Sequence, residues 1–386
     1  MQVLGGFQMS RVRGRLPKPS LFLVAAAIMS LQQSRALCTA PSMPCKHKRL
    51  VFLGTPEVSV TSLKVILEGA AASHNDPDNM YEVVGVVTQP PAPTGRRKKI
   101  TPSPVQVLAE QEGIPVLAPA KAKDEEFLQQ LRDMAPDLCV TAAYGQFLPT
   151  KFLKIPVLGT LNIHPSLLPK YRGASPVQRA LEAGDTETGV TVAFTVLKMD
   201  SGPVVSQVKC QLEGHEKATD LLQELFTVGS KELVRVLPSV WSGGVEVTEQ
   251  DESQATAADK LSAAEAQCCF EKETASKIHN KVRGFAGWPG TWCELLCGEG
   301  EGKDPSLRRV KINTTAVDQG QADLTNEYVT GVHQTTQTLS QQDANKPGAA
   351  VLGFSRPSYS FLCQSPALVT QLLYSELYAI PLLPAE

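Results

Sequence analysis

The sequence predicts an α/β fold with a mostly parallel sheet, followed by a smaller β-barrel. Short apolar runs rich in β-branched residues alternate with segments of helical periodicity between residues 49 and 241. The runs are apolar on both faces, which is typical of parallel strands covered by helices. Past residue 260, short β-like stretches favour a small barrel. With 386 residues, 42% of them apolar, the chain is long enough for two such domains.

Each expected strand is a short apolar run, and each expected helix spaces its apolar residues for one buried face. In the first domain, strands are expected at 50–53, 83–87, 138–143, 160–164, 190–197 and 204–212. Helices are expected at 58–67, 105–112, 127–134, 174–183 and 219–240. In the second domain, a helix is expected at 271–282, with strands at 291–296, 309–312 and 349–352. Trp288, which precedes Pro-Gly, is expected to pack within a turn.

The domain map follows from composition. Residues 48–241 form the first domain, and the polar, glycine-containing segment 242–259 is expected to be a linker. The second domain is expected at 260–353. Its loop insertion, 316–346, is rich in Gln, Thr, Asp and Asn. Residues 354–386 form an atypical tail.

The first 47 residues have the composition of a targeting segment. No Asp or Glu precedes Glu57, whereas Lys and Arg occur eight times before it. Basic, serine-containing segments without acids are typical of mitochondrial transit peptides. A secretory signal is the alternative, with Leu21–Met29 as its apolar core. These nine residues are too few to span a bilayer, and nine irregularly spaced cysteines oppose secretion. We therefore expect import into the mitochondrial matrix and no membrane location.

Three polar residues at predicted strand ends could act on one carbonyl group. Asn162 and His164 alternate with the apolar Ile163, so both point to the same face of their strand. Asp200 follows the strand expected at 190–197, and its carboxylate can reach an imidazole on a neighbouring strand. The carboxyl ends of parallel strands are where α/β folds bind ligands.

This set of groups suits acyl transfer to an amine. His164 would remove the proton from the attacking amine, and Asp200 would fix the tautomer of His164. Asn162 would donate a hydrogen bond to the developing oxyanion, an effect worth about 3–4 kcal/mol in other systems. Taken singly, each residue more often has a structural role, as a satisfied histidine, a turn aspartate or a backbone-bonded asparagine. Their combination on two strand ends is what favours catalysis.

These residues lie in segments that resemble the folate-dependent formyltransferases. The segments are Phe52–Pro56, Asn162–Gly173, Thr188–Thr191 and Met199–Gly202. Two further segments, Thr94–Pro104 and Val282–Gly290, resemble the methionyl-tRNA branch of that family. The resemblance implies a Rossmann-like catalytic domain and a C-terminal domain of OB type. It also implies that Asn162, His164 and Asp200 act together in catalysis.

The resemblance further implies 10-formyltetrahydrofolate as the formyl donor, tetrahydrofolate as a product and methionyl-tRNA as the acceptor. The folate-binding residues that it implies are Ser166, Leu167, Leu168, Pro169, Tyr144, Gly145 and Leu148. No Gly-x-Gly-x-x-Gly turn is present, so a dinucleotide cofactor is not supported. No metal is expected, because Cys293 and Cys297 lack a second pair at zinc spacing. A monomer is expected.

The strongest positive run after the targeting segment consists of Arg96, Arg97, Lys98 and Lys99. Its flanking Pro and Gly residues predict a loop. A charged loop is usually only solvated, but in the family this loop contacts the acceptor end of the tRNA. Phosphate contacts of this kind make affinity depend strongly on salt.

The C-terminal region departs from the family pattern. Residues 251–386 contain 11 Lys or Arg against 16 Asp or Glu, which is acidic for a region that binds tRNA. The closing strands of the family find no match after Ala350. We therefore expect these strands to be either absent, which leaves the barrel incomplete, or replaced by other segments. Two other functions stay open at this point. One is a formyltransferase that acts on an amino-sugar nucleotide or a purine precursor, and the other is a tRNA-binding protein without catalysis.

Overall fold

The computed structural model describes most of the first domain and parts of the second. The described residues are 47–297 except 77, 96 and 271, together with 306–315, 317–318, 328–329, 349–352 and 361–364. The predicted targeting segment, most of the insertion at 316–346 and most of the tail therefore lie outside the described residues, as does Arg96.

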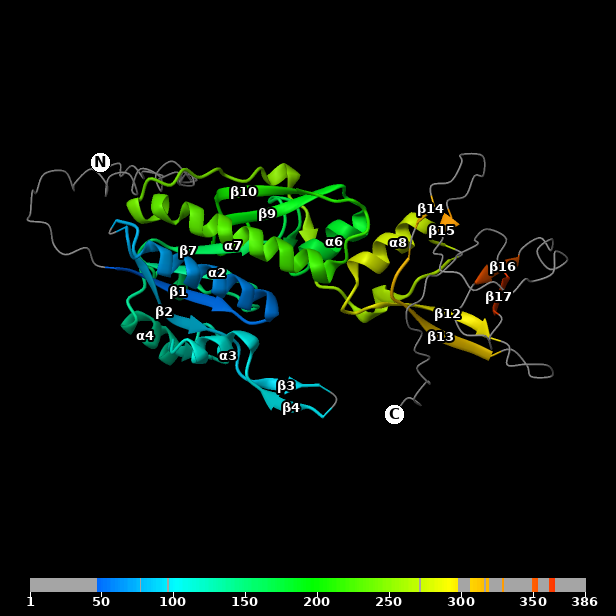
Figure 1. Ribbon diagram of the computed structural model, residues 1–386, viewed down its shortest axis with the longest axis horizontal. Helices are drawn as coiled ribbons and strands as arrows, with labels where there is room; N and C mark the ends of the chain where they lie inside the picture. The colour runs from blue at the N-terminus through cyan, green and yellow to red at the C-terminus, as the bar shows by residue number, and fades with distance from the viewer. Residues whose placement is uncertain are drawn as a thin grey trace, which may run out of the picture. The chain divides into compact units, whose positions relative to one another are not determined.

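A seven-stranded sheet forms the centre of the first region (Figure 1). Its order is β10-β9-β7-β6-β1-β2-β5. The strands are β1 (Lys48–Gly54), β2 (Tyr81–Val87), β5 (Val116–Leu117), β6 (Leu138–Ala142), β7 (Thr160–His164), β9 (Glu187–Phe194) and β10 (Val204–Gln211). The five strands from β7 to β5 run parallel, whereas β9 is antiparallel to both β7 and β10. The prediction of an α/β fold with a mostly parallel sheet is confirmed.

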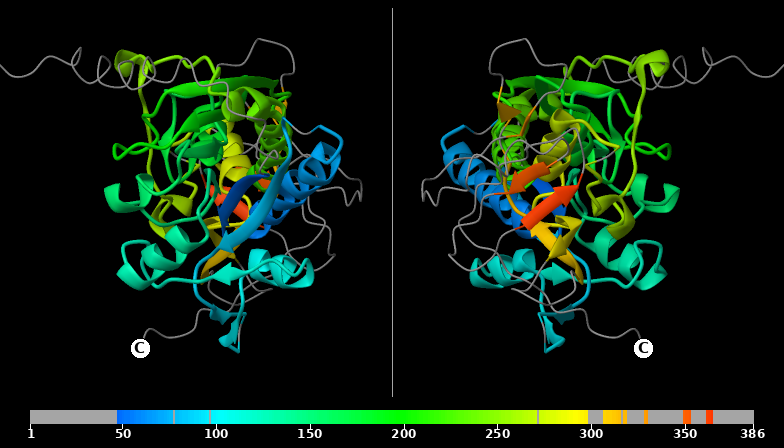
Figure 2. Two further views of the ribbon diagram at one scale, coloured as in Figure 1. Left: turned by 90° about the vertical axis from the view of Figure 1, so that its left-hand side faces the viewer. Right: turned by 90° about the vertical axis from the view of Figure 1, so that its right-hand side faces the viewer.

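Helices pack on both faces of this sheet (Figure 2). The first face is covered by α2 (Glu57–Ser73), α3 (Pro104–Gln111), α6 (Pro176–Ala183) and α7 (Ala218–Ser242), and the second by α4 (Glu125–Asp133) and α5 (Thr150–Leu153). Strand β1 shows the result most clearly. Leu50 and Phe52 contribute to the first core and Val51 and Leu53 to the second, and all four are fully buried. A central strand buried on both sides must be apolar throughout, which is why this run has no alternation.

Local signals explain where several helices begin and end. The Ser103 hydroxyl accepts a hydrogen bond from the Gln106 N–H at the start of α3, where Pro104 occupies the first helical position. Helices α6 and α7 end at Ala183 and Ser242 and are followed by Gly184 and Gly243, both at positive φ, a conformation that glycine adopts without steric cost.

Two features of the first region differ from the sequence-based expectation. The segment around the basic run forms a hairpin of β3 (Ala92–Thr94) and β4 (Lys99–Thr101) in place of a plain loop. Neither strand buries a face, so the sequence carries no alternation to reveal them. The strand expected at 190–197 ends at Phe194, although apolar residues continue beyond it. Val196 and Leu197 are instead exposed in a turn.

The second region begins with the 3₁₀-helix η3 (Ala263–Ala266) and with α8 (Ala275–Gly284), which packs against α6. A four-stranded sheet follows in the order β13-β12-β17-β16, and β14 pairs with β15 separately. The strands are β12 (Thr291–Cys297), β13 (Ser306–Ile312), β14 (Val317–Asp318), β15 (Tyr328–Val329), β16 (Ala349–Leu352) and β17 (Phe361–Gln364). Trp288 is 55% exposed, so the prediction of a packed turn residue was wrong. Phe285, three residues earlier, is the fully buried aromatic.

Within the described parts of the chain, no helix combines the length and apolar character needed to cross a bilayer.

Candidate active site

His164 ends strand β7, and its imidazole is almost completely buried. The side chain is 5% exposed, and its Nε2 lies 2.9 Å from the carbonyl oxygen of Tyr171. A carbonyl oxygen can only accept, so Nε2 must carry a hydrogen in this contact. The other ring nitrogen, Nδ1, lies 3.7 Å from Oδ2 of Asp200. In the neutral ring, Nδ1 is therefore the nitrogen that can take up a proton, and it does so facing a carboxylate.

Asp200 reaches the ring by a route that the sequence did not indicate. Because β9 is antiparallel to β7, the end of β9 at Phe194 lies opposite Leu161 and not opposite His164. The turn after β9 must fold back to bring Asp200 to the ring. Asp200 adopts a φ of 48°, which is uncommon for a residue with a side chain. Its Oδ2 also accepts a hydrogen bond from the Gly173 N–H at 2.9 Å.

This geometry divides the roles around His164 differently from the prediction. We expected Asp200 to fix the tautomer of the ring, but the contact to the Tyr171 carbonyl already does so. The distance from Asp200 to Nδ1 is longer than a hydrogen bond and within the range of an ion pair. Asp200 is therefore placed to stabilise the imidazolium that forms when Nδ1 takes up a proton.

Asn162 lies two residues before His164 on β7, on the same face of the strand. Its partner in the register is Thr141 of β6, whose hydroxyl lies 2.7 Å from Asn162 Oδ1. This is the shorter of two contacts of that hydroxyl, the other being to the Leu161 carbonyl at 3.3 Å. Because Thr141 donates to the amide oxygen, the NH₂ group of Asn162 points away from Thr141. That end of the amide is the donor an oxyanion needs.

The polar groups of the loop at 166–169 are mostly hydrogen-bonded to neighbouring parts of the chain. The Thr191 hydroxyl donates to the Ser166 carbonyl at 2.6 Å and accepts from the Leu168 N–H at 3.1 Å. The Ser166 hydroxyl donates to the carbonyl of Lys170. Leu168 is buried, while Leu167 and Pro169 are half-buried. The loop is therefore a firmly held, mainly apolar surface beside His164.

The other three residues assigned to the folate pocket follow strand β6, the neighbour of β7 in the sheet. Tyr144 and Leu148 are buried and belong to the second core, and Gly145 forms a turn at a φ of 83°. Burial raises the pKa of the Tyr144 phenol well above its usual value, so the ring stays neutral. Phe147, which the sequence did not single out, lies three residues after Tyr144 and is 68% exposed.

The basic hairpin presents its cations to solvent. Arg97, Lys98 and Lys99 are exposed, and Arg96 lies outside the described residues. Among the ion pairs within the described ranges, none involves these three side chains. Their charges are thus available to an anionic partner.

Comparisons with known proteins identify the family. The model described as "Formyl transferase" matches residues 48–237, and "Formyl transferase, C-terminal domain" matches residues 260–369. A methionyl-tRNA formyltransferase of Bacillus velezensis is 39% identical over 247 residues, which cover 64% of this chain and 74% of the bacterial one. The chain belongs to the methionyl-tRNA formyltransferase family. A family member from Thermotoga maritima is also 39% identical, over 242 residues that cover 63% of this chain and 74% of its own.

Solved structures support the fold of this family. An N-formyltransferase from Helicobacter canadensis, in complex with folinic acid and dTDP-3-aminofucose, gives a TM-score of 0.51 at 17% identity. The match covers 83% of this chain and all of that chain. At this identity the likeness concerns the fold alone. The C-terminal family match reaches residue 369, past Ala350, after which the sequence alone showed no match to the closing strands of the family.

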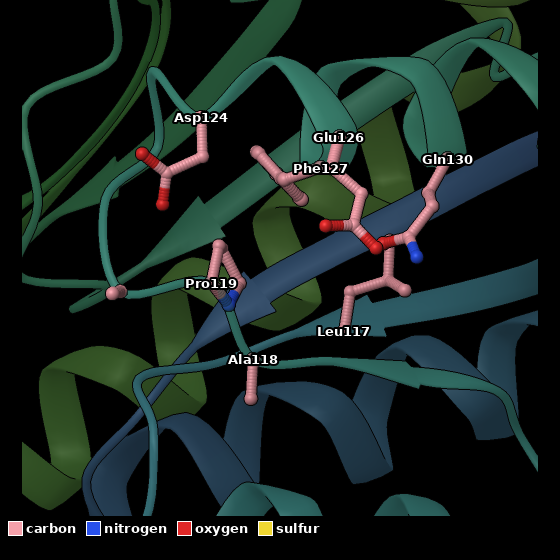
Figure 3. Close-up of a pocket in the computed structure, with 8 residues that line it drawn as sticks. Leu117, Ala118, Pro119, Asp124, Glu126, Phe127 and Gln130 are labelled. Carbon is pink, nitrogen blue, oxygen red and sulfur yellow. The ribbon is translucent and has the colours of Figure 1, made fainter.

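A pocket of about 250 Å³ lies away from this site. It is lined by Leu117, Ala118, Pro119, Ala120, Asp124, Glu126, Phe127 and Gln130. Figure 3 shows the carboxylates of Asp124 and Glu126 beside it. Strands β6, β1 and β2 stand between β5 and β7 in the sheet, so this pocket is not part of the site around His164. No cluster of His, Cys, Asp and Glu suited to a metal ion occurs among the residues that the structure describes.

The Thr141 contact predicts a specific kinetic effect. Thr141→Val keeps the shape of the side chain but frees the amide of Asn162 to rotate. We expect kcat for formyl transfer to fall about three- to tenfold, the worth of roughly one hydrogen bond, with little change in KM for folate. Steady-state kinetics would measure both constants.

Thr160→Val is the matched control. Thr160 is also a buried strand threonine, but its hydroxyl has no hydrogen-bond partner within the described structure. This variant should keep wild-type kcat. Equal kcat in both variants would remove Thr141 from the site.

Proposed function

We propose that this chain transfers the formyl group of 10-formyltetrahydrofolate to the amino group of methionyl-tRNA in mitochondria. The observation that carries the proposal is the buried His164, held between the Tyr171 carbonyl and the Asp200 carboxylate, two residues from an oriented Asn162. This set of groups matches what acyl transfer to an amine requires, and it occurs in a chain of the methionyl-tRNA formyltransferase family.

Three side chains of the protein have distinct roles in the reaction. The amine of the acceptor attacks the formyl carbon, and the NH₂ group of Asn162 donates to the oxygen that becomes negative. His164 takes the amine proton at Nδ1, while Nε2 keeps its bond to Tyr171. Asp200 stabilises the resulting imidazolium. When the tetrahedral intermediate collapses, the bond to N10 of the folate breaks and the imidazolium returns its proton to that nitrogen.

We assign the folate to the apolar loop Ser166–Pro169 and to the strand end at Tyr144 and Gly145. Phe147, three residues after Tyr144 in the sequence, is exposed. Methionyl-tRNA is assigned to the basic hairpin and to the second region, which we propose to be an OB-like domain. The chain would act as a monomer.

Single-turnover transfer of labelled formyl tests the proposal. The wild-type protein, given 10-formyltetrahydrofolate and methionyl-tRNA, should form formylmethionyl-tRNA. His164→Ala should lower the rate by about 10²–10⁴-fold, the usual range for loss of a general base. An amino-sugar nucleotide offered in parallel should not react. Transfer to that nucleotide and not to the tRNA would overturn the proposed acceptor. A His164→Ala variant at wild-type rate would overturn the mechanism.

The hairpin predicts a selective loss of tRNA affinity. Lys98→Ala combined with Lys99→Ala should raise KM for methionyl-tRNA and flatten its dependence on salt, because fewer counterions are released on binding. Folate binding, measured by fluorescence titration, should not change. Lys121→Ala with Lys123→Ala removes two other exposed lysines and serves as the control. An identical tRNA KM in the two double variants would exclude the hairpin from tRNA binding.

The mitochondrial setting rests on the composition of the first 47 residues. A reporter fused to residues 1–47 should enter isolated energised mitochondria and be shortened there. Replacing Arg11, Arg13 and Arg15 with Gln should block import. Entry of the unaltered fusion into secretory vesicles instead would contradict this location.

A further inference from the structure

The side chain of Gln250 joins the two loops that carry the partners of His164. Gln250 lies in the segment between the two regions. Its Nε2 donates to the carbonyls of Asp200 at 2.9 Å and of Gly202 at 2.7 Å. Its Oε1 accepts from Nε of Arg172 at 3.0 Å and from an Nη2 hydrogen at 2.7 Å. One primary amide thus uses both of its hydrogens on one loop and its oxygen on the other.

Arg172 anchors the second of these loops, directly after Tyr171. Its side chain is 9% exposed and contacts both carboxylate oxygens of Glu252, each at 3.1 Å. Hydrogen bonds from Arg172 and Lys198 lower the pKa of Glu252 to about 2, so this carboxylate stays charged near neutral pH. Lys198 belongs to the turn that carries Asp200. Glu252 therefore connects the same two loops as Gln250, through Arg172 on one and Lys198 on the other.

The backbone of the same segment is fixed on both sides of Gln250. Thr248 exchanges two hydrogen bonds with Val204, each at 2.8 Å. At the other end, β11 (Ala257–Ala258) pairs with β8 (Arg172–Gly173). The hydroxyl of Thr256 accepts from the Tyr171 N–H at 2.8 Å. The segment predicted as a linker is thus bound to the first region at several points.

The turn that carries Asp200 needs such anchors. Leu197 and Met199 are 50% and 64% exposed, so core packing does not hold the turn. Asp200 adopts a positive φ, and Gly202 comes so close to the Phe194 carbonyl that a Cβ would collide with it. Polar contacts from outside the turn must therefore select this conformation over others, and Gln250 supplies two of them.

We propose that Gln250 is a positioning residue for His164. It holds the turn of Asp200 against the loop of Tyr171, and so fixes the separation of the two groups that face Nδ1 and Nε2. The inference rests on the proposed function for its catalytic consequence but not for its geometric one. Gln250 acts through these loops, and no contact between its side chain and the reacting atoms is required.

Two substitutions test this role. Gln250→Met keeps the length of the side chain but removes all four hydrogen bonds. Gln250→Glu can still accept from Arg172 but turns an oxygen toward the carbonyls of Asp200 and Gly202. Both should lower kcat for formyl transfer about tenfold or more, the effect of losing one to two net hydrogen bonds, with KM for folate within about twofold. Gln254→Met is the matched control, because Gln254 is an exposed residue of the same segment that bonds Asp251.

The ¹⁵N spectrum of the His164 ring gives a readout that loss of stability alone does not move. The signal is assigned by its absence in His164→Gln. Wild-type protein should show hydrogen on Nε2, and both Gln250 variants should show a mixture of ring forms under conditions where they stay folded. Unchanged spectra in a folded Gln250 variant overturn the proposal, whether or not activity falls. If Gln250→Met does not fold, Gln250→Glu decides.

The two hypotheses can fail separately. Wild-type protein that does not formylate methionyl-tRNA contradicts the proposed function, while the ring spectra still test the positioning role. Altered spectra in Gln250→Glu with wild-type spectra in Gln254→Met support that role regardless of the acceptor. Wild-type kcat and spectra in both Gln250 variants overturn it.

Discussion

A buried imidazole with two fixed neighbours organises this end of the sheet. A polar ring at 5% exposure is costly unless its nitrogens find partners. Here one partner is a backbone carbonyl in the loop after β7, and the other is a carboxylate from the turn after β9. Neither belongs to the strand that carries the ring. The loop at 165–173 and the turn at 195–203 must therefore both close over β7 in one arrangement, and the segment after α7 ties them together.

Residues that face the core in a regular pattern could be predicted from the sequence. Strand β7 has the predicted bounds, and the alternation of Asn162, Ile163 and His164 gave the correct faces. The direction of β9 could not be predicted, since an apolar strand reads alike in parallel and antiparallel pairs. The contact between His164 and the Tyr171 carbonyl could not be predicted from the sequence either, because every residue has a backbone carbonyl. Gln250 lies in a polar run whose composition is that of a linker.

The apolar residues near the site were harder to predict than the polar ones. Tyr144 and Leu148 are assigned to a ligand pocket through resemblance, and their side chains contribute to the second core. Composition does not distinguish an apolar pocket from an apolar core, since both bury large side chains. Phe147 differs from its neighbours only in exposure, which depends on how the chain turns at Gly145. The identity of a pocket residue is thus a property of the folded backbone.

The pairing of β11 with β8 places part of the support for the reactive groups beyond the end of the N-terminal family match. The N-terminal family match ends at residue 237, and the last long helix of this region ends at Ser242. A chain shortened after Ser242 would still contain the seven strands of the sheet and the residues Asn162, His164 and Asp200. It would lose Gln250 and Glu252, whose side chains hold the two loops together, and strand β11, which pairs with Arg172 and Gly173. In such a fragment we expect the loops that carry Tyr171 and Asp200 to be less firmly held around His164. A fragment that keeps these contacts must extend to Ala258.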